Sequence, residues 1–187
     1  MVSRPTMILL AVIVTGCGTQ LPPEEPIPEQ PIKSGTLTDV FGNCETIEIV
    51  QAATASQSWR LDPTEDRLDG LHGPIYRPEW RVDDYPIEAG PNRVSPTSRD
   101  ELISVVLDLS IYEFYAEIGC KPDFGYRVQF SNSAGHVDIL FCFNCRIFKV
   151  YTNGEKVGGG YFPNDHDRIL KAMKTIFSDD PLIQSLR

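Results

Sequence analysis

The carboxyl-terminal half of the chain contains three short runs rich in hydrophobic and β-branched residues, bounded by turn-forming residues. Each run predicts a β-strand, and together they cover Tyr126–Ser131, His136–Cys142 and Arg146–Thr152. The turn-forming stretch S-N-S-A-G separates the first two runs. Because adjacent strands with short connections pair antiparallel, the three runs predict neighbouring antiparallel strands.

The dipeptide Asn153-Gly154 follows the third run and is a strong signal for a two-residue hairpin turn. Lys156–Phe162 is therefore expected to return beside the third strand. Three consecutive glycines, 158–160, predict a β-bulge or a close approach of another backbone there. These elements make an antiparallel meander of about four to five strands.

A helix is predicted before the meander. Ser98 and Glu101 have the spacing of a capping box. Apolar residues then recur at helical intervals, at Leu102, Val105, Val106 and Leu109. A second helical pattern is compatible with an extension of this helix to Gly119, through Ile111, Phe114, Tyr115 and Ile118.

A second main helix is predicted after the meander, over Asp165–Phe177 with Asn164 as its cap. One apolar face is formed by Ile169, Leu170, Met173, Ile176 and Phe177. Asp180-Pro181 is expected to start a last short helical turn. The order helix, meander, helix predicts an α+β fold with the two main helices on one face of the sheet.

The region before these elements is harder to interpret. The β-branched run Thr46–Ala52 follows Gly42 and Asn43 and predicts a strand. From Ala53 to Thr97 no periodicity is sustained, so a long, partly packed loop is expected. A loop of that length is either functional or conceals an element that the pattern does not show.

At the amino terminus, Arg4 precedes the apolar run Met7–Val14, which ends in V-T-G-C at Cys17. The run has the length of a signal peptide and falls short of the roughly 20 residues that a spanning helix needs. Residues 1–16 are therefore predicted to be a signal peptide and not a transmembrane helix.

The V-T-G-C sequence resembles the lipobox of bacterial lipoproteins. The resemblance implies that Cys17 receives a diacylglycerol, that the signal is cut before it, and that the new amino terminus is acylated. Several acyl chains give stable membrane anchoring, since each buried methylene contributes about 0.8 kcal/mol. Gly18 stands where the enterobacterial sorting rule places Asp for retention, so the resemblance favours the outer membrane of the bacterial cell envelope.

Residues 17–34 contain five prolines and three glutamates but no aromatic residue. This composition favours an extended stalk, which at about 3.1 Å per residue could hold the next domain roughly 50 Å from the bilayer. The rest, 35–187, is the size of a single globular domain. The net charge of −9 and the lack of basic runs disfavour nucleic acid as a partner.

Four cysteines remain in the predicted domain: Cys44, Cys120, Cys142 and Cys145. An even count in an extracytoplasmic protein favours disulfides. If Cys142 and Cys145 lay in one extended strand, their α-carbons would be roughly 10 Å apart, too far for a bond. Either a tight turn at Asn144 joins them or each finds a distant partner. Our first expectation is a disulfide between Cys120 and the C-F-N-C segment.

Three other interpretations of the cysteines stay open. Zinc binds four thiolates in C-x-x-C turns, but only one such pair is present. A redox site of the thioredoxin type needs the C-x-x-C to open a helix, whereas a strand-like run follows here. In the third interpretation, the cysteines are free thiols that pack in the core as small hydrophobic residues. The segment V-D-I-L-F-C-F-N-C also resembles small uncharacterised bacterial proteins that carry C-F-x-C, over roughly Cys120 to Tyr151, and this resemblance implies no activity.

Two further groups of polar residues were weighed as sites. In D-H-D, which includes His166, acids are expected from the helix dipole alone. His136 and Asp138 lie two residues apart on a predicted strand and share a face, which is the minimum for an acid/base pair, but most such pairs are solvated strand surface. Without a recognisable catalytic motif, we expect a binding or envelope-structural module attached to the membrane by lipid, with an envelope protein as a partner. The alternative is a thiol-redox or zinc protein centred on C-F-N-C.

Overall fold

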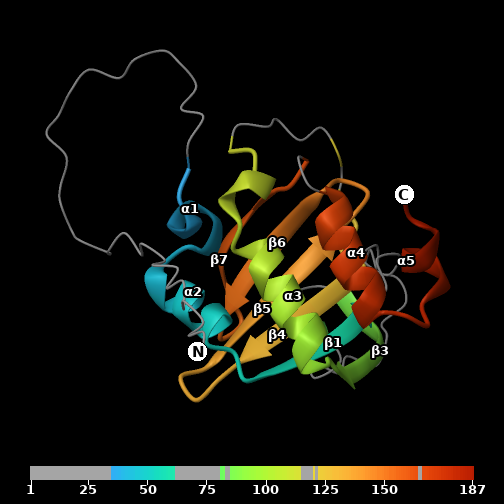
Figure 1. Ribbon diagram of the computed structural model, residues 1–187, viewed down its shortest axis with the longest axis horizontal. Helices are drawn as coiled ribbons and strands as arrows, with labels where there is room; N and C mark the ends of the chain where they lie inside the picture. The colour runs from blue at the N-terminus through green and yellow to red at the C-terminus, as the bar shows by residue number, and fades with distance from the viewer. Residues whose placement is uncertain (1–34, 62–80, 83–84, 115–119, 121, 164–165) are drawn as a thin grey trace, which may run out of the picture.

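A computed structural model describes residues 35–61, 81–82, 85–114, 120, 122–163 and 166–187 (Figure 1). The predicted signal peptide, Cys17 and the stalk lie outside these residues, as does the predicted cap Asn164. Within the described part of the chain, none of the helices has the length and apolarity needed to cross a bilayer.

The described strands form one antiparallel sheet in the order β2-β3-β1-β4-β5-β6-β7. The mixed α+β class is confirmed, and the sheet is wider than the four to five strands expected. Its strands are β1 (Ala55–Leu61), β2 (Arg81–Val82), β3 (Tyr85–Arg93), β4 (Tyr126–Ser131), β5 (His136–Cys142), β6 (Ile147–Thr152) and β7 (Glu155–Tyr161).

The predicted meander is confirmed as β4 to β7, four consecutive neighbours in the sheet. The turn between β6 and β7 has positive φ at both central residues, 53° at Asn153 and 82° at Gly154. Such a turn matches the twist of the two strands, which is why Asn-Gly predicts a hairpin. Local turn chemistry therefore sets the register of β7 on β6.

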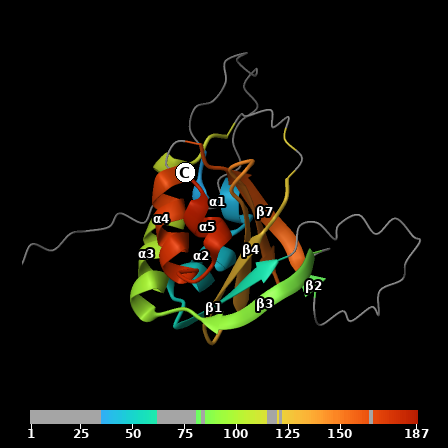
Figure 2. The same ribbon diagram turned by 90° about the vertical axis from the view of Figure 1, so that its right-hand side faces the viewer.

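The helices lie on one side of the sheet, as predicted (Figures 1 and 2). α3 and α4 pack against each other across it. The short α5 begins where Asp180-Pro181 predicted a final turn. The described helices are α1 (Leu37–Phe41), α2 (Cys44–Gln51), α3 (Pro96–Val106), the 3₁₀ helix η3 (Leu109–Ile111), α4 (His166–Ile176) and α5 (Pro181–Ser185).

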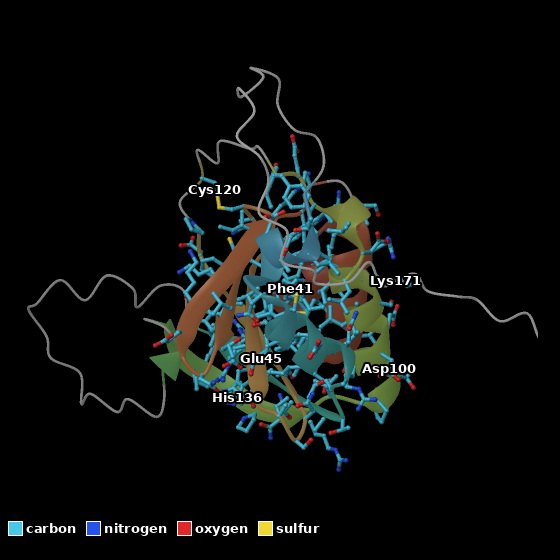
Figure 3. All side chains as sticks on the ribbon, turned by 90° about the vertical axis from the view of Figure 1, so that its left-hand side faces the viewer. Phe41, Glu45, Asp100, Cys120, His136 and Lys171 are labelled. Carbon is cyan, nitrogen blue, oxygen red and sulfur yellow. A yellow bond between two sulfur atoms is a disulfide. The ribbon has the colours of Figure 1, made fainter. Side chains whose placement is uncertain are left out.

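The sheet carries a hydrophobic cluster on each face. Alternate residues of the meander meet the helices in the main core, among them Val128, Ile139 and Phe141, and Phe41 of α1 joins them (Figure 3). A smaller cluster covers part of the opposite face and consists of Trp59, Leu61, Phe124, Leu140, Cys142, Cys145 and Tyr151. The residues of β5 are consequently buried on both faces of the sheet.

The predicted strand Thr46–Ala52 is wrong, because Cys44–Gln51 forms helix α2. The Asn43 side chain caps it by accepting a hydrogen bond from the Thr46 backbone N–H at 2.8 Å. Thr46, Ile49 and Val50 then form one buried face at helical spacing. The cap and this packing outweigh the β-branched composition.

The predicted start of the helix before the meander is also wrong. Ser95, not Ser98, is the cap, and its hydroxyl accepts the Ser98 backbone N–H at 3.1 Å. Pro96 follows at the first helical position, where a missing N–H costs nothing. The helix does not extend toward Gly119: it ends at Val106, and Glu113 instead pairs with β7. Residues 115–119 lie outside the described residues.

The expected loop from Ala53 to Thr97 contains strands β1 and β3. In β1 the residues on the helix side include two buried serines, Ser56 and Ser58, so the hydrophobic alternation is lost. In β3 the prolines Pro86 and Pro91 interrupt any strand pattern, and register shifts mark its pairing with β1. The remainder of that predicted loop, including Tyr76 and Trp80, lies outside the described residues.

Gly158 brings two backbones together, as the glycine run predicted. An ideal Cβ at this position would lie 2.2 Å from the Val40 carbonyl oxygen of α1. Gly42 makes the reciprocal approach, with φ of 83° and a Cβ position 2.2 Å from the Val157 carbonyl oxygen. Only glycine permits this contact between α1 and β7.

We predict that Gly158→Ala destabilises the protein by about 1 to 3 kcal/mol, because the added methyl group forces α1 away from β7. Chemical denaturation of the purified variant measures this loss. Gly125→Ala is the matched control, since a Cβ there meets nothing within 4 Å. Equal stability of both variants would contradict the close contact.

Candidate functional site

The two cysteines of C-F-N-C lie on either side of a tight turn. β5 ends at Cys142, residues 143–146 form the turn, and the Arg146 backbone N–H donates to the Phe143 carbonyl at 3.3 Å. Arg146 has a φ of 55°, in the left-handed region. One of the two alternatives was a tight turn at Asn144 that joins Cys142 to Cys145. The turn forms, but no disulfide joins these two cysteines.

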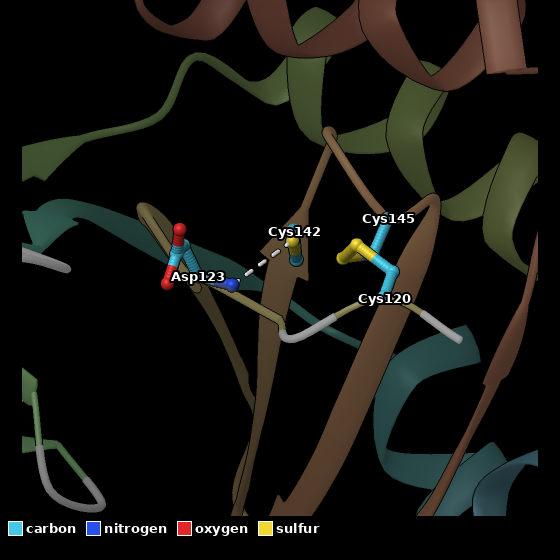
Figure 4. The surroundings of a disulfide bond; sticks show 4 residues. All are labelled: Cys120, Asp123, Cys142 and Cys145. Carbon is cyan, nitrogen blue, oxygen red and sulfur yellow. Dashed lines mark hydrogen bonds between the residues drawn. A yellow bond between two sulfur atoms is a disulfide. The ribbon is translucent and has the colours of Figure 1, made fainter. Parts of the chain in front are cut away.

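Cys145 is instead bonded to Cys120, with α-carbons 5.7 Å apart (Figure 4). The predicted disulfide between Cys120 and the C-F-N-C segment is thus observed. The bond fastens the segment before β4 to the turn between β5 and β6. A bond across 25 residues restricts the unfolded chain and stabilises the fold by about 3 kcal/mol in the chain-entropy view.

Cys142 carries a fully buried thiol. Its Sγ accepts the Asp123 backbone N–H at 3.3 Å (Figure 4). Burial raises the pKa of the Cys142 thiol, and the neighbouring N–H groups, first that of Cys145, act in the opposite direction. The thiol is therefore protonated at neutral pH.

The remaining cysteines are not part of this cluster. Cys44, the first residue of α2, is disulfide-bonded and is not a free thiol, and Cys17 lies outside the described residues. Across the described ranges, no three His, Cys, Asp or Glu side chains are grouped so as to hold a metal ion. The sulfur of Cys145, bonded to Cys120, is not a thiolate that zinc could bind in this form.

A cleft of about 850 Å³ lies around β7 and the end of α1. On the helix side it is lined by Asp39, Val40 and Tyr112, and on the other side by Phe124 and Ile147. The glycines of β7 form part of its floor, so backbone groups and not side chains face this part of the cleft. The other lining residues are Glu113, Phe114, Pro122, Phe148, Lys149, Lys156, Val157 and Tyr161.

Two lysines lie near each other in this cleft. Lys156 pairs with Tyr151 and Lys149 with Gly159, so both lysines are on the sheet face opposite the helices. The Lys149 ammonium lies over the Phe124 ring, 4.7 Å from its centre. Asp39 lies toward the helix side, where hydrogen bonds from Thr36 lower the pKa of its carboxyl and keep it ionised. The cleft thus offers both charges beside aromatic rings.

His136 and Asp138 were both expected on a solvated strand surface, and this expectation is wrong for Asp138. Its carboxylate is buried and accepts hydrogen bonds from Arg127 at 2.8 and 3.0 Å and from Gln129 at 3.0 Å. The Arg127 guanidinium also lies 4.1 Å from the centre of the Trp59 ring. This network links three strands and engages the Oδ1 oxygen of the carboxylate in three bonds.

His166 of the D-H-D segment is buried at the start of α4, while Asp167 is exposed in its first turn as the helix dipole predicts. The imidazole stacks on Phe162, with ring planes 5° apart. Burial and the nearby Arg146 lower the pKa of His166. The histidine is therefore a neutral part of the core.

The lowered pKa of His166 predicts a stability change with pH. The unfolded chain takes up the proton near pH 6.5, before the folded protein does, so stability falls as the pH drops below that value. The free energy of unfolding should decrease by up to about 1.4 kcal/mol per pH unit more than in His166→Gln. Denaturation curves at pH 7.5, 6.5 and 5.5 measure the difference, and parallel curves would contradict it.

The sequence did not reveal the cleft, because its walls come from segments far apart in the chain. The glycine run after the Asn-Gly turn was the one available signal, and it indicated only a close approach. Comparisons with protein-family models, with curated proteins and with solved structures found no match. The function therefore has to be argued from the chain itself.

Proposed function

We propose that the protein is a non-catalytic binding module of the bacterial cell envelope, anchored to a membrane by lipid on Cys17, and that its ligand occupies the cleft at β7. The observation that carries this proposal is the cleft of about 850 Å³. That volume lies within the range of ligand sites, which combine apolar walls with a few placed polar groups.

The lining supports a ligand with both apolar and polar parts. Phe114, Ile147 and Val157 are partly exposed and provide apolar surface, while Lys149 and Lys156 add positive charge. The glycines of β7 line the cleft with backbone groups, which can exchange hydrogen bonds with a polar part of the ligand. We infer that the partner is an envelope component that exposes an apolar segment beside a polar or anionic group.

The disulfide supports an extracytoplasmic location. Bonds such as Cys120–Cys145 persist in oxidising compartments and are rare in the cytosol. The lipobox resemblance at Cys17 and the proline-rich composition of 17–34 fit the same location, with the stalk holding the domain away from the bilayer. Gly18, in the place where the enterobacterial sorting rule has Asp for retention, favours the outer membrane.

The alternative is a thiol or zinc function centred on C-F-N-C. Stoichiometric zinc in the purified full chain, lost in Cys142→Ser, would favour it over the binding module. With Cys145 bonded to Cys120 and the Cys142 thiol buried, the described form of the protein presents a single protonated sulfur there. We therefore rank this alternative second.

The anchoring part predicts that Cys17→Ser moves the protein from the membrane fraction to the soluble fraction, because no acyl chain can be attached. Cell fractionation followed by intact-mass measurement tests this. Cys142→Ser, which removes the free cysteine of the described residues, is the matched control and should stay with the membrane. A Cys17→Ser protein that remains membrane-bound, or an unmodified mass for the wild type, would contradict the anchor.

The binding part predicts that a photo-crosslinking residue at position 156 captures a discrete partner in living cells. Lys156 is exposed and lines the cleft, so a bound ligand comes within reach of it. The control position is Asp100, exposed on the outer side of α3 (Figure 3). Adducts of the same mass at both positions, or none at 156, would count against a ligand in the cleft.

A further inference from the structure

Three cysteines meet at the turn between β5 and β6. Cys142 and Cys145 belong to the same buried cluster, together with Phe124. The backbone N–H of Cys145 lies close enough to the Cys142 sulfur to affect its ionisation. A free thiol therefore lies next to one sulfur of the disulfide (Figure 4).

The two ends of this cluster differ in their access to solvent. Cys142 is fully buried, and Cys145 is nearly so. Cys120, at the other end of the disulfide, is exposed. Reagents in solution can thus reach Cys120, whereas inside the protein Cys142 lies beside Cys145 (Figure 4).

We propose that these cysteines form an internal thiol–disulfide exchange site, in which Cys142 displaces Cys120 from Cys145 and leaves Cys120 as an exposed, reactive thiol. This inference concerns a chemical activity separate from ligand binding and does not depend on the ligand of the cleft.

The exchange is balanced within the chain. Cys142 loses its proton, and its thiolate attacks the Cys145 Sγ. The Cys142–Cys145 bond forms while the Cys145–Cys120 bond breaks, and the electron pair leaves on Cys120, which takes up a proton. One disulfide and one thiol are present before and after, so the step requires no oxidant or reductant.

Two features of the site favour this step. The Asp123 backbone N–H, 3.3 Å from the Cys142 sulfur, stabilises the negative charge as it develops. Burial keeps external oxidants and alkylating reagents away from Cys142, but it also raises the pKa of the thiol, so the exchange should accelerate as the pH rises. The turn between Cys142 and Cys145 also removes the separation of roughly 10 Å that an extended strand would impose on their α-carbons.

The product would present a thiol where the present form has none. A Cys120 thiol at the surface can attack a disulfide of a small molecule or a partner protein, forming a mixed disulfide and releasing one thiol. The segment that includes Pro122 and Phe124, which lines the cleft, would also lose its covalent link to the turn.

The test is alkylation of the full-length native protein with iodoacetamide at pH 8, followed by acid quenching, digestion and disulfide mapping by mass spectrometry. The wild type should acquire label on Cys120 at the same rate as a Cys142–Cys145 disulfide appears. Cys142→Ser should label Cys120 at least tenfold more slowly. Asn144→Ser, an exposed position in the same turn, is the matched control and should behave as the wild type.

Circular dichroism of each variant verifies folding, and the appearance of the new disulfide in the wild type is a direct readout that needs no variant. The proposal is overturned if Cys120 remains unlabelled while the original bond persists. Equal labelling of Cys120 in the wild type and in Cys142→Ser would also overturn it, because an external agent would then open the bond.

Discussion

The backbone contact between the end of α1 and strand β7 is the constraint on which the candidate site depends. Gly42 and Gly158 allow each backbone to approach the carbonyl of the other element, and no larger residue fits at either position. α1 thereby forms one wall of the cleft, while β7 provides a floor without bulky side chains. The glycines weaken β7 as an isolated strand, and its pairing with β6 together with α1 compensates for this.

The disulfide and the polar network secure the opposite face of the sheet, where no described helix packs. Cys120–Cys145 holds the segment beside Phe124 against the β5–β6 turn. The Asp138 carboxylate of β5 accepts hydrogen bonds from the Arg127 guanidinium and the Gln129 amide, both on β4. These bonds link the two strands. Removing one partner of such a buried ion pair typically costs about 3 to 5 kcal/mol, because the other charge stays buried and unpaired. This face is therefore maintained by specific bonds more than by a thick hydrophobic layer.

Much of the fold was predictable wherever local chemistry and tertiary packing agree. The meander was predicted because hydrophobic runs, turn residues and the Asn-Gly hairpin all indicate strands over 126–162. Prediction failed where one residue outweighs composition: Asn43 caps a helix within β-branched sequence, and Pro91 conceals strand β3. The disulfide was predicted from the even number of cysteines and from the position of Cys120 just before the first strand of the meander. The cleft was not, because Val40, Tyr112 and Lys149 meet only in the folded chain.

The central claim is that an envelope component fills the cleft at β7. Hydrogen–deuterium exchange of the full chain, compared between native envelope vesicles and detergent-purified protein, tests it most directly. We expect the backbone amides of 112–114 and 155–161 to exchange more slowly in the vesicles, while those of α3 exchange equally in both samples. The same exchange rates at β7 in the two samples would contradict the claim.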